Sequence, residues 1–163
     1  NQSWLDSIPG GFRLPLKGFS PGLPSGGEND FDSFAKRYAQ YADQDAEIAS
    51  TAAYAYDAVM LAHYSTAWAQ ANEQSDVFGV ARGLRALSAD GESMALTGEN
   101  LSEARASFSS NKAINVYGAS GALDYNESTE QLVTPVDIWS IDANTKGKTV
   151  VYRCVESSCS EVN

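Results

Sequence analysis

The polar residue that most needs explaining is Asp57, which lies between Tyr56 and Ala58 in an otherwise apolar stretch. A buried carboxylate must find hydrogen-bond donors, because an unpaired buried charge is strongly unfavourable. Such a carboxylate could contact a ligand, or it could accept hydrogen bonds from backbone N–H groups of a neighbouring loop. We favour the structural role for Asp57.

Nucleophilic catalysis is not predicted. Residues 118–121, Gly-Ala-Ser-Gly, begin like a nucleophile elbow, but the Gly-x-Ser-x-Gly motif requires glycine where this chain has Ala122. The only histidine, His63, lies on a helix with apolar and aromatic neighbours, so we expect a structural role for it. We therefore predict no catalytic residues and no enzymatic activity.

Metal and cofactor sites are not predicted either. The sequence Asp-Gln-Asp-Ala-Glu at 43–47 resembles a calcium loop, but Ile48 follows where such a loop needs glycine, so we expect helix capping. The glycines before residue 28 follow no phosphate-binding pattern. Cys154 and Cys159 would need two more soft ligands to hold zinc, and we expect them to form a local disulfide instead. Two free thiols are the alternative.

The length and charge of the chain exclude some classes of protein. Its 163 residues suit a single domain. The net charge is −10 and the 11 Lys and Arg residues are scattered, which disfavours nucleic-acid binding. The chain contains no run of eighteen apolar residues, which is about the length that a membrane-spanning helix needs.

Hydrophobic periodicity predicts four helices in the first two thirds of the chain. They are expected over about 31–43, from a cap at Asp45 to about Gln70, over 76–88, and after Asn100, which has capping-box spacing to Glu103. The second helix has small or apolar residues around most of its circumference. We therefore expect it to lie in a core with Tyr56 and Val59 buried.

After Lys112 the pattern changes to short strands separated by turn residues. Strands are expected at 114–117, 122–125, 133–141 and 149–153, with a hairpin connection at 144–148. The predicted organisation is a Gly- and Pro-rich extended segment over 1–28, a helical part over 29–112 and a β-rich part over 113–163.

The order of these elements resembles that of a known family. The segment 52–62 (Ala-Ala-Tyr-Ala-Tyr-Asp-Ala-Val-Met-Leu-Ala), a second helix, the glycine turn leading into Leu-Asp-Tyr-Asn at 123–126, and the strand 133–141 follow one another. Over roughly residues 10–145 the chain resembles the C-terminal part of type I periplasmic binding proteins, the substrate-binding components of ABC transporters for branched-chain amino acids and related solutes.

This resemblance implies an α/β fold, with helices packed on a sheet as part of a doubly wound lobe and a β-rich C-terminal segment. Members of the family are longer and have two lobes, so we expect the chain to be a fragment whose partner is the remainder of its own protein. Its opening Asn1-Gln-Ser-Trp-Leu, with neither an initiator Met nor a signal sequence, agrees with that expectation. The exposed surfaces of such a fragment would favour self-association.

The resemblance also implies a function: capture of a small solute, such as an amino acid, for an ABC importer. The partners would be that solute and the membrane permease, and the location periplasmic or extracellular, with a lipid anchor carried by a missing N-terminal part. Alternatives are a ligand-sensing receptor ectodomain and a secreted structural or interaction module without a small-molecule site.

The residues expected to contact the solute are Ser50, Thr51 and Tyr54, because in the resembled family the segment leading into this helix faces the cleft between the lobes. Hydroxyl groups and free N–H groups at a helix N-terminus suit a carboxylate. The alternative is that Ser50 and Thr51 only form the first turn of a helix.

Overall fold

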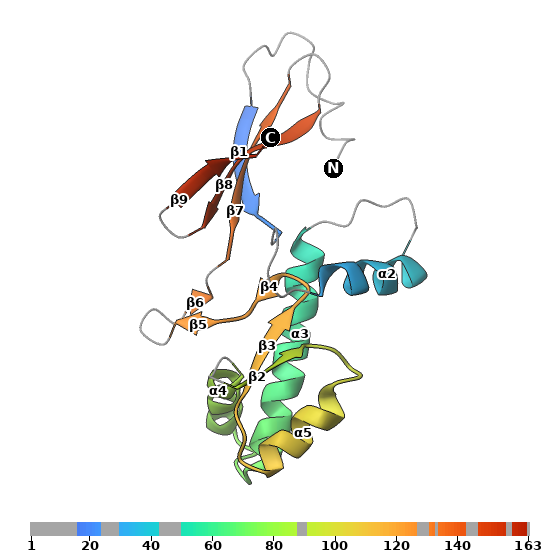
Figure 1. Ribbon diagram of the computed structural model, residues 1–163, viewed down its shortest axis with the longest axis vertical. Helices are drawn as coiled ribbons and strands as arrows, with labels where there is room; N and C mark the ends of the chain where they lie inside the picture. The colour runs from blue at the N-terminus through green and yellow to red at the C-terminus, as the bar shows by residue number, and fades with distance from the viewer. Residues whose placement is uncertain are drawn as a thin grey trace. The chain divides into compact units, whose positions relative to one another are not determined.

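The computed structural model describes residues 16–23, 30–42, 50–87, 91–126, 131–132, 134–142, 147–155 and 158–162. These residues form a mixed α/β protein with four helices, a four-stranded sheet, a three-stranded sheet and a two-stranded ribbon (Figure 1). The contacts divide the chain into unit 1 (Asn1–Gly22 and Thr134–Asn163) and unit 2 (Leu23–Val133).

The helices of unit 2 confirm the four helices predicted from periodicity. They are α2 (Phe31–Tyr41), α3 (Ser50–Ala71), α4 (Val77–Ala86) and α5 (Leu101–Ser109). Asp76 caps α4 by accepting a hydrogen bond from the Gly79 backbone N–H at 2.7 Å. The predicted cap at Asp45 and the calcium-like segment 43–47 lie outside the described residues.

The sheet of unit 2 contains β2 (Glu92–Ala95), β3 (Ile114–Gly118) and β4 (Gly121–Ala122) in that order. Strands β2 and β3 are parallel and α5 connects them, so the three elements form a βαβ unit. Strand β4 turns back antiparallel to β3, and β5 (Tyr125–Asn126) pairs with β6 (Gln131–Leu132) in a separate ribbon.

The main core of unit 2 lies between α3, α5 and the β2–β3 pair. Its ten buried residues are Tyr64, Ala67, Leu87, Met94, Leu96, Ala104, Phe108, Ile114, Val116 and Leu123. The hydroxyl of Tyr64 donates to the Thr97 carbonyl oxygen at 2.7 Å, which satisfies the one polar atom of that side chain. Burial raises the pKa of Tyr64 to about 12.

The prediction that α3 lies within a core with Val59 buried is wrong. The helix has one buried face, while Val59 is 56% exposed and Ala58, Ala62 and His63 lie on the same open side. Small apolar residues occur on both faces, so the residue types do not distinguish the solvent side of the helix from its buried side. Tyr56 is half-buried.

The predicted capping box of α5 is also wrong. Asn100 has helical backbone angles and its side chain makes no capping hydrogen bond. Its side-chain amide donates instead to the Ala95 carbonyl oxygen at 2.9 Å, and its backbone N–H lies 3.3 Å from the hydroxyl oxygen of Thr97. The turn between β2 and α5 is thereby held at both ends.

Unit 1 is a four-stranded antiparallel sheet in the order β1 (Leu16–Pro21), β7 (Val136–Ile141), β8 (Lys148–Val155) and β9 (Ser158–Glu161). Strands β7 and β8 confirm the predicted hairpin strands, whereas β9 was not predicted. In β1, Gly18 lies opposite Trp139, whose indole ring occupies the space that a side chain at position 18 would need. The Lys148 ammonium lies 5.4 Å from the centroid of that ring.

Candidate functional site

Asp57 links α3 to the turn between β3 and β4. One carboxylate oxygen accepts from the Ala119 backbone N–H at 2.9 Å; the other accepts from the Ser120 backbone N–H at 2.7 Å and the Ser120 hydroxyl at 2.5 Å. The side chain is only 2% exposed. The predicted structural role of Asp57 is confirmed, because backbone N–H groups of a neighbouring loop hold its charge.

The turn that receives Asp57 depends on two glycines. A Cβ atom at Gly118 would overlap the Asp57 carboxylate, so only glycine allows this close approach. Gly121 has φ of 118°, a conformation that glycine adopts readily. Burial raises the pKa of Asp57 above its ordinary value, and the hydrogen bonds from Ser120 and Ala119 oppose that rise without cancelling it.

The same turn also anchors α2. The Asp30 backbone N–H, just before the helix, donates to the Gly118 carbonyl oxygen at 2.9 Å. Phe34 of α2, Ala53 of α3 and Ala119 of the turn form a second buried cluster. The turn at 118–121 therefore positions both α2 and α3, and α3 carries the predicted solute contacts.

The predicted solute contacts lie at the N-terminal end of α3. Thr51 is exposed in the first turn and Tyr54 is half-buried one turn later. Ser50 is the first residue of the helix, and its side chain lies outside the described part. Neither Thr51 nor Tyr54 lines the cavity that α2, α3 and the turn after β2 form.

A cavity of about 440 Å³ lies among α2, α3 and the turn after β2. We call it the aromatic cavity because four of its eight lining residues are aromatic: Phe34, Arg37, Tyr38, Tyr41, Tyr56, Met60, Gly98 and Glu99. The ring of Phe34 is buried, with its centroid 5.2 Å from that of Tyr56 and 5.7 Å from that of Tyr38. These contacts hold the three rings against one another.

Arg37 adds a charge that is already paired. Its guanidinium donates to the Asp30 carboxylate at 2.6 Å and lies 5.8 Å from the Tyr56 ring centroid. Burial lowers the pKa of Arg37, but the Asp30 hydrogen bond and the surrounding negative groups outweigh burial, and the net shift is upward. Burial raises the pKa of Tyr56, although the nearby Arg37 opposes this shift.

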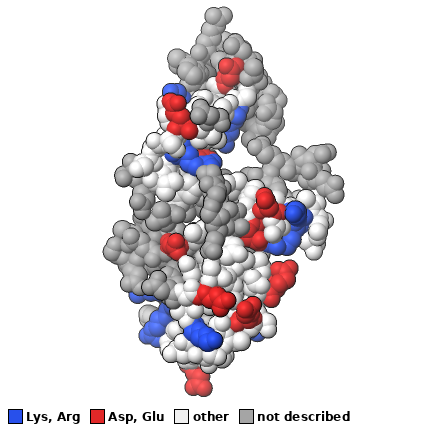
Figure 2. All heavy atoms as spheres, in the orientation of Figure 1, with Lys and Arg blue, Asp and Glu red and all other residues white. Residues whose placement is uncertain are grey.

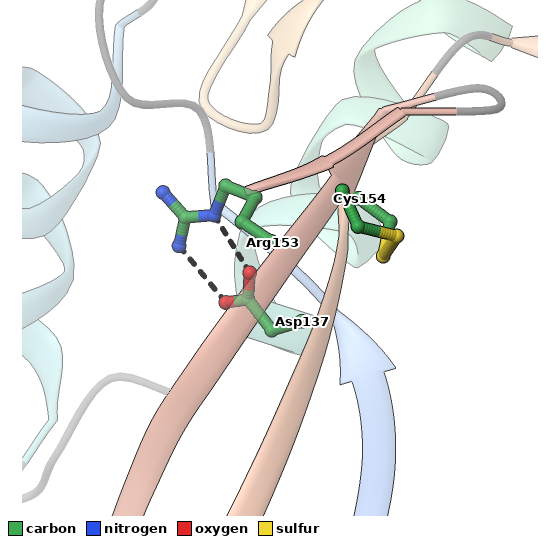
Figure 3. Close-up of a disulfide and its surroundings, with 4 residues drawn as sticks. Asp137, Arg153 and Cys154 are labelled. Carbon is green, nitrogen blue, oxygen red and sulfur yellow. Dashed lines mark hydrogen bonds and ion pairs between the residues drawn. A yellow bond between two sulfur atoms is a disulfide. The ribbon is translucent and has the colours of Figure 1, made fainter. Parts of the chain in front are cut away.

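Unit 1 contains an ion pair with two hydrogen bonds. Arg153 of β8 donates to both carboxylate oxygens of Asp137 of β7, at 2.6 and 2.9 Å (Figure 3). A side chain at Gly22 would come too close to the same carboxylate. The pair cross-links neighbouring strands and was not recognised in the sequence, where Asp137 is only one position of an alternating strand.

The predicted disulfide is present in the structure. Cys154 and Cys159 lie directly opposite each other in β8 and β9, with Cα atoms 4.0 Å apart. Arg153 and Cys154 point to opposite sides of β8, so the ion pair and the disulfide use different faces of the sheet (Figure 3). Among the described residues no cysteine is free.

Charged side chains are mixed on the visible surface: Lys and Arg lie among Asp and Glu (Figure 2). Across the described ranges, no group of three or more His, Cys, Asp or Glu residues could hold a metal ion. No helix in this part of the chain is sufficiently long and apolar to cross a membrane. Comparison of the chain with protein-family models, with curated proteins and with solved structures found no match.

Proposed function

We propose that this chain is part of the extracytoplasmic solute-binding component of an ABC importer and captures a small solute such as an amino acid. The observation that carries the proposal is the attachment of Asp57 to Ala119 and Ser120. It joins the Tyr-Asp-Ala helix to the glycine turn, the two segments on which the resemblance to type I periplasmic binding proteins chiefly depends.

The βαβ unit of β2, α5 and β3 supports the finer fold that this function requires. Many doubly wound folds have a mainly parallel sheet with an antiparallel strand at its edge, as β4 is here. We interpret this unit as part of a doubly wound lobe, completed by the remainder of a two-lobe protein. The four-stranded sheet of unit 1 would correspond to strands that cross back toward the second lobe.

The disulfide between Cys154 and Cys159 supports a location outside the reducing cytoplasm, as an importer component requires. In the periplasm or at the cell surface, the partner of the loaded protein would be the membrane permease.

The solute would meet the N-terminal end of α3. Thr51 is exposed there, and hydroxyl and N–H groups at a helix N-terminus would suit a carboxylate. Ser50 and Tyr54 would complete this wall. Solute-binding proteins close two lobes around their ligand, so one wall leaves much of the solute wet. We expect the isolated chain to bind no more tightly than about 1 mM, near −4 kcal/mol.

Titration of the isotopically labelled chain with the standard amino acids tests this proposal by nuclear magnetic resonance. We expect the backbone amides around Thr51 and Tyr54 to shift with a dissociation constant of about 1 mM or weaker. Thr51→Ala should reduce the affinity. Thr66→Ala is the matched control, because Thr66 is exposed on the same helix and its hydroxyl bonds only to the Ala62 carbonyl oxygen.

Two outcomes would contradict the proposal in different ways. Micromolar binding of a free amino acid would mean that the site is complete in this chain, and the fragment interpretation would be wrong. If no amino acid moved the amides at the start of α3, the solute-binding role itself would lose its support.

The exposure of Val77 and Phe78 on α4 favours an interaction module as the second candidate function. Such a module would show no solute response at α3 and would lose partner binding or self-association when Phe78 is replaced. A sensing ectodomain would respond to the solute like an importer component. The neighbouring coding sequence separates these two, because a receptor adds a membrane helix and a signalling domain.

A further inference from the structure

The aromatic cavity has the composition of a binding site rather than of a loosely packed core. Phe34, Arg37, Tyr38 and Tyr41 follow one another at i, i+3, i+4 and i+7 and so form one stripe of α2. The opposite wall consists of Tyr56 and Met60, one turn apart on α3. Figure 1 shows α2 projecting sideways from near the N-terminal end of α3.

The outer part of this stripe buries little surface within the molecule. Tyr38 is 37% exposed and Tyr41 is 91% exposed. A core needs its aromatic rings covered, whereas these two rings extend the walls of the cavity toward solvent. Large exposed rings beside a cavity are typical of surfaces that bind a ligand.

The third side of the cavity is a fixed turn. The Thr97 backbone N–H donates to the Ala95 carbonyl oxygen at 2.9 Å, and the Tyr64 and Asn100 side chains hold the carbonyl oxygens of Thr97 and Ala95. Gly98 and Glu99 lie between these anchors. A Cβ atom at Gly98 would meet no atom within 4 Å, so the cavity remains open at this point.

The charges around the cavity favour a cation. Arg37 is neutralised by Asp30, and the exposed carboxylate of Glu99 leaves the group one negative charge in excess. The whole chain has a net charge of −10, so an anionic ligand would be repelled. Tyrosine ring faces attract cations, and Arg37 above Tyr56 already makes such a contact.

We propose that the aromatic cavity binds a small organic ammonium ion with an apolar body. The alkyl groups would lie against Tyr38, Tyr41 and Met60, and the positive charge would lie near Glu99 and the ring faces. This site is separate from the solute wall at Thr51, and neither proposal depends on the other.

Choline and its uncharged isostere 3,3-dimethylbutan-1-ol are the probes that test the charge. They have nearly the same shape, so a difference in affinity measures recognition of the ammonium group. We expect choline to bind about fivefold more tightly than the isostere, as cation–π contacts at partly exposed sites provide. Amide shifts in the labelled full chain should centre on Tyr41 and Glu99.

Two substitutions with matched controls locate the site. Tyr41→Ala and Glu99→Gln should each weaken choline binding by about threefold, and Glu99→Gln should leave binding of the isostere unchanged. Val59→Ala and Glu103→Gln should change neither, because these residues are also exposed in unit 2 but do not line the cavity. Circular dichroism checks that each variant is folded.

Three results would overturn the proposal. Equal affinity for choline and the isostere would show a merely apolar cavity. Shifts centred away from α2 and Glu99 would place the ligand elsewhere. The absence of any response at tens of millimolar choline would show that the cavity does not bind this class of ligand. The response of the Thr51 amides to amino acids, measured separately, would stand in each case.

Discussion

The carboxylate of Asp57 holds a helix and a turn together while almost completely removed from water. It accepts three hydrogen bonds, two of them from consecutive backbone N–H groups of Ala119 and Ser120. Removing such an acceptor leaves buried donors without partners, which is more costly than never having buried them. A single side chain thus controls the position of both the turn and α3.

Asp57→Asn should destabilise unit 2 by about 1–3 kcal/mol, measured by urea denaturation. An amide has only one acceptor oxygen, so its NH₂ group would face either the Ala119 or the Ser120 N–H group. Asp76→Asn is the matched control, since asparagine caps a helix as well as aspartate does. Its effect should lie within about 0.5 kcal/mol.

The stability difference between wild type and Asp57→Asn should depend on pH with a definite sign. Burial raises the pKa of Asp57 above its ordinary value of 3.8. The stability that the carboxyl group contributes is therefore complete below pH 3.8 and is lost as the pH rises through the higher folded-state value. The difference in the free energy of unfolding between wild type and Asp57→Asn should become smaller as the pH rises from 3.8. If this difference grew with pH instead, the three hydrogen bonds would lower the pKa of Asp57 more than burial raises it.

The role of Asp57 could be predicted from sequence, but the aromatic cavity could not. A carboxylate inside an apolar helix requires donors, and the glycine turn offered them. The stripe containing Phe34, Tyr38 and Tyr41 has the spacing of an ordinary core face, and nothing in it shows that its outer rings are exposed. Glu99 lines the cavity because of the path that the chain takes after β2, and the sequence does not reveal that path.

At the scale of elements, α3 is a helix with two unlike faces made from similar residues. The buried face includes Ala53, Tyr64 and Ala67, and the exposed face includes Ala58 and Val59. Helix propensity is satisfied on both faces by alanine, so burial is decided by the packing of α4, α5 and the sheet on one side.

Tyr56→Ala and Val59→Ala should separate the two faces by thermal or urea unfolding. Tyr56 packs against Phe34, and its loss should cost about 3 kcal/mol, near the lower limit for buried aromatic residues. Val59 is more than half exposed, so its truncation should change stability by no more than about 0.5 kcal/mol. Comparable losses at both positions would mean that the outer face of α3 is covered in solution.

Two of the strands missed in the sequence, β2 and β9, share a physical cause. Strand β2 has the sequence Glu-Ser-Met-Ala and β9 has Ser-Cys-Ser-Glu, and neither contains a run of β-branched or aromatic residues. Each is a strand because a neighbour pairs with it: β3 for the first, β8 for the second. Strong local patterns, such as Val-Asp-Ile-Trp-Ser-Ile in β7, were recognised as strands.

At the scale of the whole molecule, the two units are stabilised differently. All fourteen buried hydrophobic residues among the described ranges belong to unit 2. The described residues of unit 1 rely on strand pairing, the Asp137–Arg153 ion pair and the disulfide. The loop that the disulfide closes is short and removes little entropy from the unfolded chain, so we expect its effect to be local.

Reduction of the disulfide should loosen β9 and leave unit 2 unchanged in hydrogen-exchange measurements. The Val162 N–H, which donates to the Val151 carbonyl oxygen at 3.1 Å, should exchange faster after reduction. The Val116 N–H, which donates to the Leu87 carbonyl oxygen, is the control within the same spectrum. An equal acceleration of exchange at Val116 would contradict a purely local effect of the disulfide. Free thiols in the denatured, unreduced protein would contradict the disulfide itself.

The pairing of β1 with β7 has a consequence for the order of events during synthesis. Leu16 lies opposite Ile141, so partners in one sheet leave the ribosome more than a hundred residues apart. All of unit 2 lies between them, and because it is one contiguous segment of the chain its contacts can form while translation continues. Strand β1 cannot pair with β7 until β7 has been synthesised and has left the ribosome. We therefore expect helices α2 to α5 to form in the nascent protein before β1 pairs with β7.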